Sequence, residues 1–169
     1  MEGDLELARS LWSDKEVSKY ISHGGFTDQM IIEKFNTELE HQKTHNVAYW
    51  PMFQLSDGKF VGVCGLRPFE ISESAKKETD NILMLGYQLM RNMWGNGLAT
   101  EATKRVAKYA IEDLKLTNVV AVHHPENHAS GKVLLKSGFI KKYDIFFPKA
   151  GLEIPVYYFL DDERKLITY

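Results

Sequence analysis

Cysteine is almost absent from the sequence, since Cys64 is the single one among 169 residues. One cysteine cannot close a disulfide within the chain, so the sequence predicts a reducing, cytoplasmic location. A run of about 18 apolar residues is also missing. The first residues, Met1–Asp4, are acidic and lack the apolar stretch of a signal peptide. We therefore expect neither a membrane span nor a secretion signal.

An excess of charge of one sign is missing too. The chain has 21 Lys and Arg against 23 Asp and Glu, a formal net charge of −2. Proteins that bind nucleic acids gain much of their affinity from a positive surface that meets the phosphates, so this balance argues against such a partner. What is present is typical of one globular domain, with 44% apolar and 26% charged residues.

Apolar residues recur at helical spacing in some stretches and alternate or run together in others. The pattern predicts helices over 4–21, with a break and a new N-cap at Ser13-Asp14, from Thr27 onward, over 95–116 and over 128–137. It predicts strands over 47–55, 60–69, 81–90, 118–123, 140–147 and 152–160. This order of elements favours a single mixed α/β sheet.

A loop with two glycines, Trp94-Gly95-Asn96-Gly97, joins the predicted strand 81–90 to the next helix. Glycines let a ligand approach the backbone, and the first N–H groups of a helix lack intrahelical partners at its positive end. These features predict an anion site suited to a pyrophosphate, although such glycines also serve simply to turn a chain. The P-loop pattern is missing, and so is Gly-x-Gly-x-x-Gly, because Thr100 stands at its third glycine. A P-loop NTPase and a dinucleotide fingerprint are thereby excluded.

Two segments resemble the GNAT superfamily of N-acetyltransferases. Trp94–Ala102, WGNGLATEA, is similar to the acetyl-CoA loop of that family and, within it, to the RimJ/RimL-like branch. Pro125–Phe139, PENHASGKVLLKSGF, is similar to a second block of that branch, Pro-x-Asn-x-x-Ser-x-x-x-Leu-x-x-x-Gly-Phe. The resemblance spans nearly the whole chain and implies a single N-acetyltransferase domain over residues 1–169.

The resemblance also implies a fold. It is α/β (an α+β mixed sheet), the GNAT-like acyl-CoA N-acyltransferase fold, with a mostly antiparallel central sheet, a splayed parallel pair and helices on both faces. The branch usually begins with a strand of the type Thr-x-Arg-Leu-x-Leu-Arg, whereas this chain opens at Glu2–Leu5, already within a helix. The first N-terminal strand is thus missing from the pattern. Because an uncovered sheet edge favours association, a homodimer is a further expectation.

The cosubstrate implied by the resemblance is acetyl-CoA, and no metal is implied. The pantetheine arm would enter the wedge between the splayed strands and bond to the backbone of Leu89, Met90 and Arg91. The rest of the cofactor site would consist of backbone amides in the loop and helix start and of two polar residues in the second block: Trp94, Gly95, Asn96, Gly97, Leu98, Ala99, Thr100, Asn127 and Ser130. Asn127 would equally serve as a helix N-cap, and Ser130 as part of a helix surface.

The implied reaction transfers the acetyl group of acetyl-CoA to a primary amine, a protein N-terminal α-amine or a small-molecule amine, by direct attack on the thioester. The expected catalytic groups are the Leu89 N–H for the oxyanion, Ser130 for proton transfer and His123 as base. Two positions depart from the family, since Leu134 replaces the tyrosine acid of many members and Met84 replaces a glutamate of the branch. These departures leave an alternative open, a catalytically weak or inactive acyl-CoA-binding or interaction module of the same fold.

His123 itself ends a strand, where histidines are often structural. The remaining reactive side chains are weaker candidates. His123-His124-x-x-x-His128 is a poor metal-ligand set, because Pro125 interrupts any helix between the histidines. Cys64 lies mid-strand, where a buried and inert thiol is the ordinary case. His23 and Glu70 lie on segments that could border the acceptor pocket.

Overall fold

The computed structural model describes residues 2–22, 24–69, 82–148 and 151–160. In chain order the elements are α1 (Glu2–Trp12), α2 (Lys15–Ser18), α3 (Asp28–His45), β1 (Tyr49–Phe53), β2 (Phe60–Pro68), β3 (Leu83–Leu89), the 3₁₀ helix η2 (Arg91–Met93), α5 (Leu98–Glu112), β4 (Asn118–Val122), α6 (His128–Lys136), β5 (Ile140–Phe147) and β6 (Leu152–Leu160). Every predicted strand is present. The last two have the predicted bounds.

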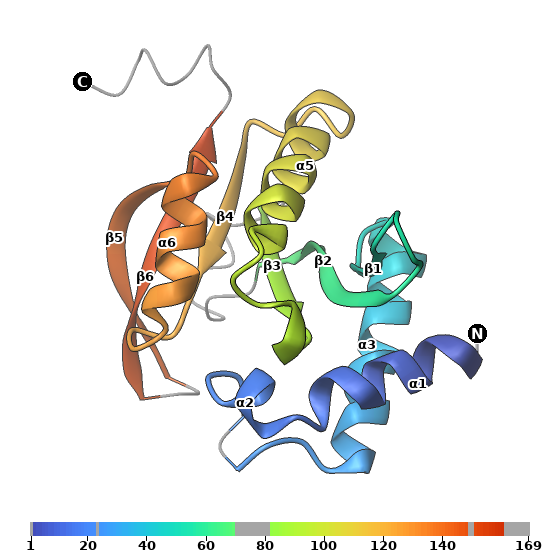
Figure 1. The fold of residues 1–169 in the computed structure, drawn as a ribbon. Coiled ribbons are helices and arrows are strands. Elements are labelled where there is room, and N and C mark those ends of the chain that lie inside the picture. The colour runs from blue at the N-terminus through green and yellow to red at the C-terminus, as the bar shows by residue number, and fades with distance from the viewer. Residues whose placement is uncertain (1, 23, 70–81, 149–150, 161–169) are drawn as a thin grey trace. The chain divides into compact units, whose positions relative to one another are not determined.

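The strands form a six-stranded sheet in the order β1-β2-β3-β4-β6-β5 (Figure 1). Strands β3 and β4 are parallel, with Met84 opposite Val120. The pairs β1–β2, β4–β6 and β5–β6 are antiparallel. The predicted fold class, a mixed and mostly antiparallel sheet with a parallel pair, is therefore confirmed. Among the described residues the chain opens on helix α1, as expected.

Two compact units divide the chain. One comprises Met1–Arg67 and Tyr87–Ala99, and the other comprises Pro68–Gly86 and Thr100–Tyr169. Strand β3 and helix α5 each contribute residues to both units. The single functional domain over residues 1–169 stays a prediction.

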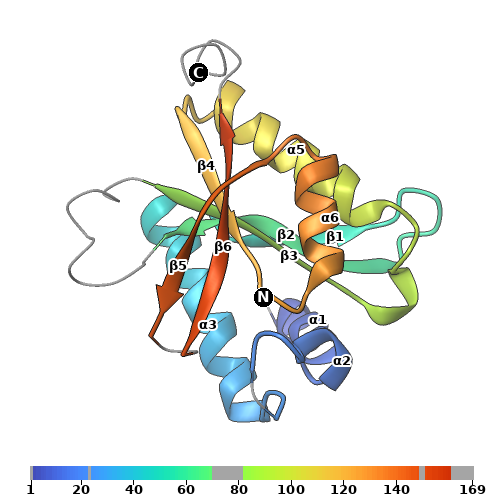
Figure 2. The same ribbon diagram turned by 90° about the vertical axis from the view of Figure 1, so that its left-hand side faces the viewer.

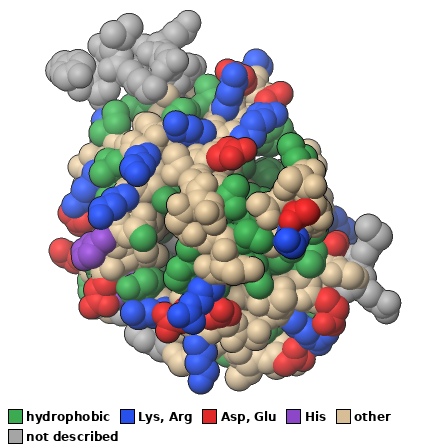
Figure 3. Space-filling view, viewed as in Figure 1, with side chains coloured by type: hydrophobic (Ala, Val, Ile, Leu, Met, Phe, Trp, Pro, Cys, Tyr) green, Lys and Arg blue, Asp and Glu red, His purple; other side chains and the backbone are tan. Residues whose placement is uncertain are grey.

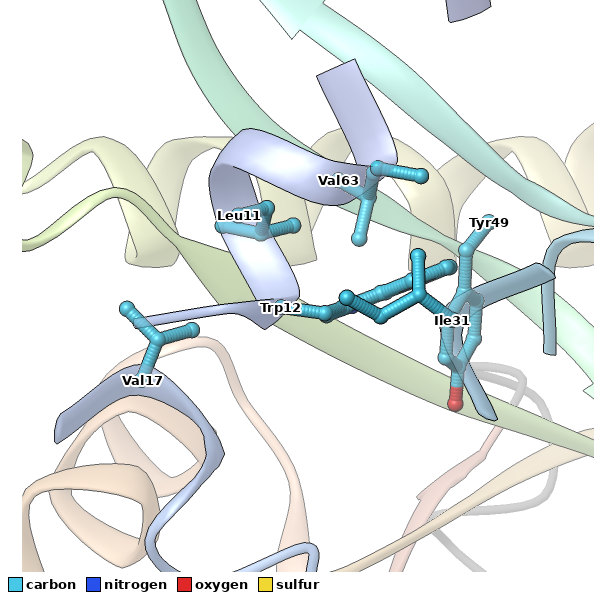
Figure 4. Packing of buried hydrophobic residues seen from close by; sticks show 7 residues of the cluster. Leu11, Trp12, Val17, Ile31, Tyr49 and Val63 are labelled. Carbon is cyan, nitrogen blue, oxygen red and sulfur yellow. The ribbon is translucent and has the colours of Figure 1, made fainter. Parts of the chain in front are cut away.

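The first unit is built around an apolar cluster between its helices and strands. Leu11 and Trp12 of α1 pack against Ile31 of α3, Tyr49 of β1 and Val63 of β2, and all five are buried. Figure 4 shows these side chains converging from four elements. Figure 1 shows α1 crossing α3. The helices are thus fixed to the sheet by apolar packing.

The helix starts follow the predicted caps. Helix α1 ends at Trp12, and the Asp14 carboxylate caps α2 by accepting a 2.8 Å hydrogen bond from the Glu16 N–H. The Thr27 hydroxyl caps α3 by accepting a bond of 3.3 Å from the Met30 N–H. Because a side-chain oxygen satisfies an N–H group that has no intrahelical partner, local sequence alone sets these boundaries.

The sequence suggests only that two glycines weaken β2 locally. In the structure both are needed because neighbouring backbone lies too close for a side chain. A Cβ on Gly65 would lie 1.9 Å from the carbonyl oxygen of Ala48, and a Cβ on Gly62 would lie 2.2 Å from that of Gln88. Gly62 also has a φ of +141°, which side chains disfavour. Both glycines therefore allow neighbouring backbone segments to approach β2 closely, one from β1 and one from β3.

Strand β1 is the terminal strand of the sheet, and its outer edge offers few hydrogen-bond donors. The Tyr49 N–H already donates to the buried Glu38 carboxylate of α3 at 3.0 Å. Pro51, two residues on and therefore facing the same edge, has no N–H. A charged residue and a proline are common means of blunting a sheet edge. The predicted homodimer stays a prediction, and this edge is poorly suited to strand pairing.

The second unit is built on β4, β6 and β5, which lie side by side in Figure 2. Its core contains Phe69, Met84, Val120 and Val156. Helix α6 packs against β5. Gly138, with a φ of +91°, follows the last residues of α6, where the sequence predicts a C-terminal glycine. The unit thus holds the second family-like block on one helix above a sheet.

The surface carries charges of both signs. On the face drawn in Figure 3, Lys and Arg side chains lie among Asp and Glu side chains. Within the described ranges, no helix has both the length and the apolar character needed to cross a membrane.

Candidate functional site

The loop that follows β3 is a structured turn in the first unit. The Met93 N–H donates to the Met90 carbonyl at 2.9 Å and the Trp94 N–H to the Arg91 carbonyl at 3.2 Å, which forms the 3₁₀ helix η2. The Asn96 side-chain amide then donates to the carbonyls of Met93 and Trp94, both at 3.3 Å. The sequence predicted a glycine loop here and did not predict η2.

Trp94 is tied to the end of β3. Its indole N–H donates a hydrogen bond of 2.9 Å to the carbonyl oxygen of Leu89, while about half of its side chain stays exposed, at 48%. The sequence assigned only the backbone amide of Trp94 to the site. The side chain therefore has an additional role, because it holds the loop against the strand from which it leaves.

The two glycines of the loop need their special conformation. Gly95 and Gly97 have φ values of +77° and +79°, a left-handed region that residues with a Cβ rarely adopt. Among the described residues, and apart from the two neighbours in the chain, no heavy atom lies within 4 Å of the place where either Cβ would stand. The backbone of the loop is therefore open on that side, and a ligand would meet peptide groups rather than side chains.

Helix α5 starts directly after Gly97, at Leu98. The N–H groups of its first turn have no intrahelical acceptors, and the helix dipole places partial positive charge at this end. Leu98 and Ala99 pack with Val61, Leu89 and Met93 in an apolar cluster, which fixes the helix start against β2 and β3. Open glycine backbone and a fixed helix N-terminus together suit a phosphate group.

The end of β3 presents one polar group for the predicted oxyanion role. The Met90 N–H donates to the Val61 carbonyl of β2 at 2.9 Å, so this predicted cofactor contact is already used within the sheet. Because successive N–H groups of a strand point to opposite edges, the Leu89 N–H points away from β2. The Leu89 carbonyl on that edge accepts from Trp94. The Leu89 N–H therefore remains as the candidate donor.

The second block lies on α6 in the second unit. The Asn127 side-chain oxygen caps α6 by accepting from the Ser130 N–H at 3.1 Å, so the N-cap interpretation of Asn127 is confirmed. Ser130 lies in the first turn of α6 and is half-buried. The carbonyl of Thr100 accepts a bond of 3.4 Å from the Ser137 hydroxyl at the end of the same helix.

His123 follows the last residue of β4, and its ring is half-buried. Its Nδ1 lies 2.8 Å from the carbonyl oxygen of His124, and its Nε2 lies 3.2 Å from the hydroxyl of Tyr157. Burial lowers the pKa of His123 below its usual value of 6.5, and the neighbouring basic groups add to this effect. Nothing in the sequence pattern signals the contact with Tyr157, which lies far along the chain on β6.

The predicted site residues fall into two groups. Leu89–Ala99 lie together in the first unit, whereas Thr100, His123, Asn127 and Ser130 belong to the second. The predicted wedge takes residues from both units. His23 and Glu70 lie outside the described residues.

Metal binding and catalysis by the Cys64 thiol receive no support within the described parts of the chain. No group of three or more His, Cys, Asp or Glu side chains could hold a metal ion there. Cys64 is buried, and burial raises the pKa of its thiol to about 12, as an inert core cysteine requires.

Comparison with known proteins decides the family. A family model described as an acetyltransferase (GNAT) domain matches residues 1–140. The chain belongs to the GNAT acetyltransferase family. A curated relative, the uncharacterized N-acetyltransferase p20 of Bacillus licheniformis, is 30% identical over 166 residues, which cover 92% of this chain and 85% of the relative.

Solved GNAT structures share the fold. An acetyltransferase of this family from Bacillus anthracis has a TM-score of 0.76 at 21% identity, covering 95% of this chain and 90% of that one. Spermidine N-acetyltransferase from Vibrio cholerae, in complex with CoA and spermine, has a TM-score of 0.70 at 16% identity, covering 95% and 91%.

Membership in the GNAT family confirms the predicted enzyme class, an acetyl-CoA-dependent N-acetyltransferase. The loop and helix start described above fit its cosubstrate, because open backbone at a positive helix end suits the pyrophosphate of acetyl-CoA. The roles of the individual residues stay predictions.

Proposed function

We propose that this GNAT enzyme acts in the manner of the RimJ/RimL-like branch and acetylates a primary amine. The acceptor is a protein N-terminal α-amine or a small-molecule amine, and residues 1–169 serve as one catalytic domain. The branch assignment is supported by the loop Trp94–Ala102 and the block Pro125–Phe139, which carry the branch pattern in the expected order.

The observation that carries the proposal is the turn between β3 and α5. Gly95 and Gly97 expose backbone, η2 and the Trp94–Leu89 bond hold that backbone in place, and α5 starts where a pyrophosphate would be stabilised. In the proposed complex the amides of residues 94–100 bind the pyrophosphate. The backbone of residues 89–91 and the side chains of Asn127 and Ser130 meet the pantetheine arm.

The chemistry requires a neutral amine, a donor for the oxyanion and a proton for the leaving thiolate. An α-amine has a pKa of about 8 and a lysine amine about 10.4, so a base or a desolvated site must favour the neutral form. The amine nitrogen attacks the thioester carbon directly, and the Leu89 N–H stabilises the oxyanion. The C–S bond then breaks, and the proton lost by nitrogen ends on sulfur. His123 and Ser130 serve these proton transfers.

The test has two stages. Titration calorimetry with acetyl-CoA should give saturable binding below millimolar concentration. Purified protein should then release CoA thiol with at least one acceptor from a panel of peptides with free N-termini, a polyamine and lysine, and mass spectrometry should find the acetylated product. Absence of acetyl-CoA binding contradicts the proposed site. Tight binding without acetylation of any acceptor supports the inactive module instead.

A further inference from the structure

A histidine and a tyrosine form a hydrogen-bonded pair in the second unit. The Nε2 of His123 lies 3.2 Å from the hydroxyl oxygen of Tyr157, and the two ring centroids are 5.4 Å apart. Tyr157 lies on β6, where it is opposite Ala121 of β4, and only 6% of it is exposed. Two strands of the sheet therefore hold the pair in a fixed geometry.

The second nitrogen of His123 sets the direction of this hydrogen bond. Its Nδ1 lies 2.8 Å from the carbonyl oxygen of His124, and a carbonyl only accepts hydrogen bonds, so Nδ1 carries the proton of the neutral ring. Nε2 is then an acceptor. The Tyr157 hydroxyl consequently donates its proton to His123, and the phenol is hydrogen-bonded to a base.

The surroundings keep His123 neutral. Among the described residues, His128 on α6, Lys141 on β5 and the adjacent His124 lower the pKa of the ring, whereas its hydrogen bond to the His124 backbone raises it. Lys141 in turn binds the carboxylate of Asp144 at 2.8 Å. Burial and these groups lower the pKa of His123, so the ring accepts a proton at neutral pH rather than already holding one.

Helix α6 covers the pair at its N-terminal end. A Cβ on Gly131 would lie 2.9 Å from Nε2 of His123 and 3.5 Å from the Tyr157 hydroxyl, so the helix approaches closely because residue 131 has no side chain. Gly131 directly follows Ser130, the residue that the second block offers for proton transfer. Leu134, farther along α6, is only 1% exposed, and its hydrocarbon side chain has no ionisable proton.

We infer that the Tyr157 hydroxyl carries the proton in acetyl transfer. His123 is a positioning residue, and its Nε2 accepts the phenolic proton of Tyr157. The inference rests on the proposed function and names a further residue for the same reaction. As the amine nitrogen bonds to the thioester carbon, its proton passes to the Tyr157 oxygen while the phenolic proton passes to Nε2 of His123. When the C–S bond breaks, the same two bonds return one proton to the thiolate sulfur, and His123 is neutral again.

The direct test compares two neighbouring tyrosines of β6. Tyr157→Phe removes only the hydroxyl of the pair, and we expect kcat to fall by about 100-fold, within the range of general acid–base catalysis, with acetyl-CoA affinity unchanged. Tyr158→Phe is the matched control, because its hydroxyl lies 3.0 Å from that of Tyr143 and not from His123. We expect the control to keep kcat within about twofold of the wild type, whereas an equal loss in both variants overturns the inference.

The pH profile separates a proton carrier from a structural residue. In the wild type, kcat/KM per neutral acceptor should fall as pH drops through the lowered pKa of His123, below 6.5. This acidic limb should vanish in Tyr157→Phe and in His123→Gln and persist in His128→Gln, which changes an exposed histidine. A limb that persists in Tyr157→Phe overturns the inference, even if His123→Gln loses it.

The outcomes also distinguish this inference from the proposed function. If the wild type turns over and Tyr157→Phe has an unchanged kcat, the role of Tyr157 is overturned and the proposed function stands. Acetyl-CoA binding without turnover in the wild type overturns both. Should Tyr157→Phe lose acetyl-CoA binding or its thermal transition, His123→Gln and its pH profile still decide, because a limb retained there overturns the inference.

Discussion

The indole N–H of Trp94 donates a hydrogen bond of 2.9 Å to the carbonyl oxygen of Leu89. This bond fixes the loop that leads into α5 against the strand that precedes it. It also occupies the Leu89 carbonyl on the edge facing away from β2, the edge to which the N–H of the same residue points. One side chain thereby links the pyrophosphate loop to the predicted oxyanion donor.

Removing this link should weaken acetyl-CoA binding. Trp94→Phe keeps an aromatic ring and loses the donor, and one lost hydrogen bond of about 1 kcal/mol corresponds to about fivefold weaker binding. Trp50→Phe is the matched control, because the Trp50 indole donates a bond of the same length, 2.9 Å, to Gln42 away from the loop. Calorimetry should show weaker binding for Trp94→Phe alone. Equal affinities for the two variants contradict the linking role.

Gly97→Val tests the backbone of the loop itself. A valine at a φ of +79° is strained by about 1–3 kcal/mol, although no atom of the described residues outside the adjacent ones blocks its Cβ. Gly58→Val offers a control with similar strain, since Gly58 has a φ of +68° and open space in the turn before β2. Both variants should lose similar thermal stability, and only Gly97→Val should lose acetyl-CoA binding. Retained affinity in Gly97→Val would show that the loop is only a turn.

Ser130→Ala should lower turnover more than affinity. The helix cap survives the change, because Asn127 accepts from the Ser130 backbone N–H, which alanine retains. We expect a loss in kcat of about tenfold, less than for a strong general acid, because serine is a poor acid. Ser10→Ala removes an exposed helical serine of α1 and should leave kcat unchanged. A wild-type rate in Ser130→Ala removes Ser130 from the mechanism.

Lys34 gives the first unit a pH-dependent stability. Its ammonium lies 4.8 Å from the Trp12 ring centroid and 3.8 Å from the Glu38 carboxylate, yet burial and, to a smaller extent, the charge of Arg67 together lower its pKa from 10.5 to about 8. Between pH 8 and 10.5 the unfolded state therefore binds more protons than the folded state, so the free energy of unfolding rises with pH.

Urea unfolding of the wild type and of Lys34→Met measures this effect, because their difference cancels the other titrating groups. The difference should rise by up to about 3 kcal/mol between pH 8 and 10.5 and stay flat below pH 7. A flat difference over the whole range would show that the Lys34 ammonium is not desolvated.

Features set by neighbouring residues could be predicted from the sequence. The caps at Asp14, Thr27 and Asn127, and the bounds of β5 and β6, follow from local hydrogen bonding and from alternating side chains. The loop before α5 was found for the same reason, since its two glycines carry the signal themselves.

Contacts between distant residues could not be predicted in this way. The pairing of His123 with Tyr157 depends on the register between β4 and β6, and the roles of Gly62 and Gly65 depend on how closely β1 and β3 approach β2. Neither the pairing nor the close approach leaves a pattern along the chain, because tertiary packing creates both.

Acetyl transfer from acetyl-CoA to an amine can be measured directly. Purified protein is assayed for CoA thiol release with and without each amine of the acceptor panel, and the acetylated amine is quantified by mass spectrometry. We expect acceptor-dependent release that is matched mole for mole by acetylated amine and is lost in Gly97→Val. Acetyl-CoA binding with no acceptor-dependent release across the whole panel would contradict it.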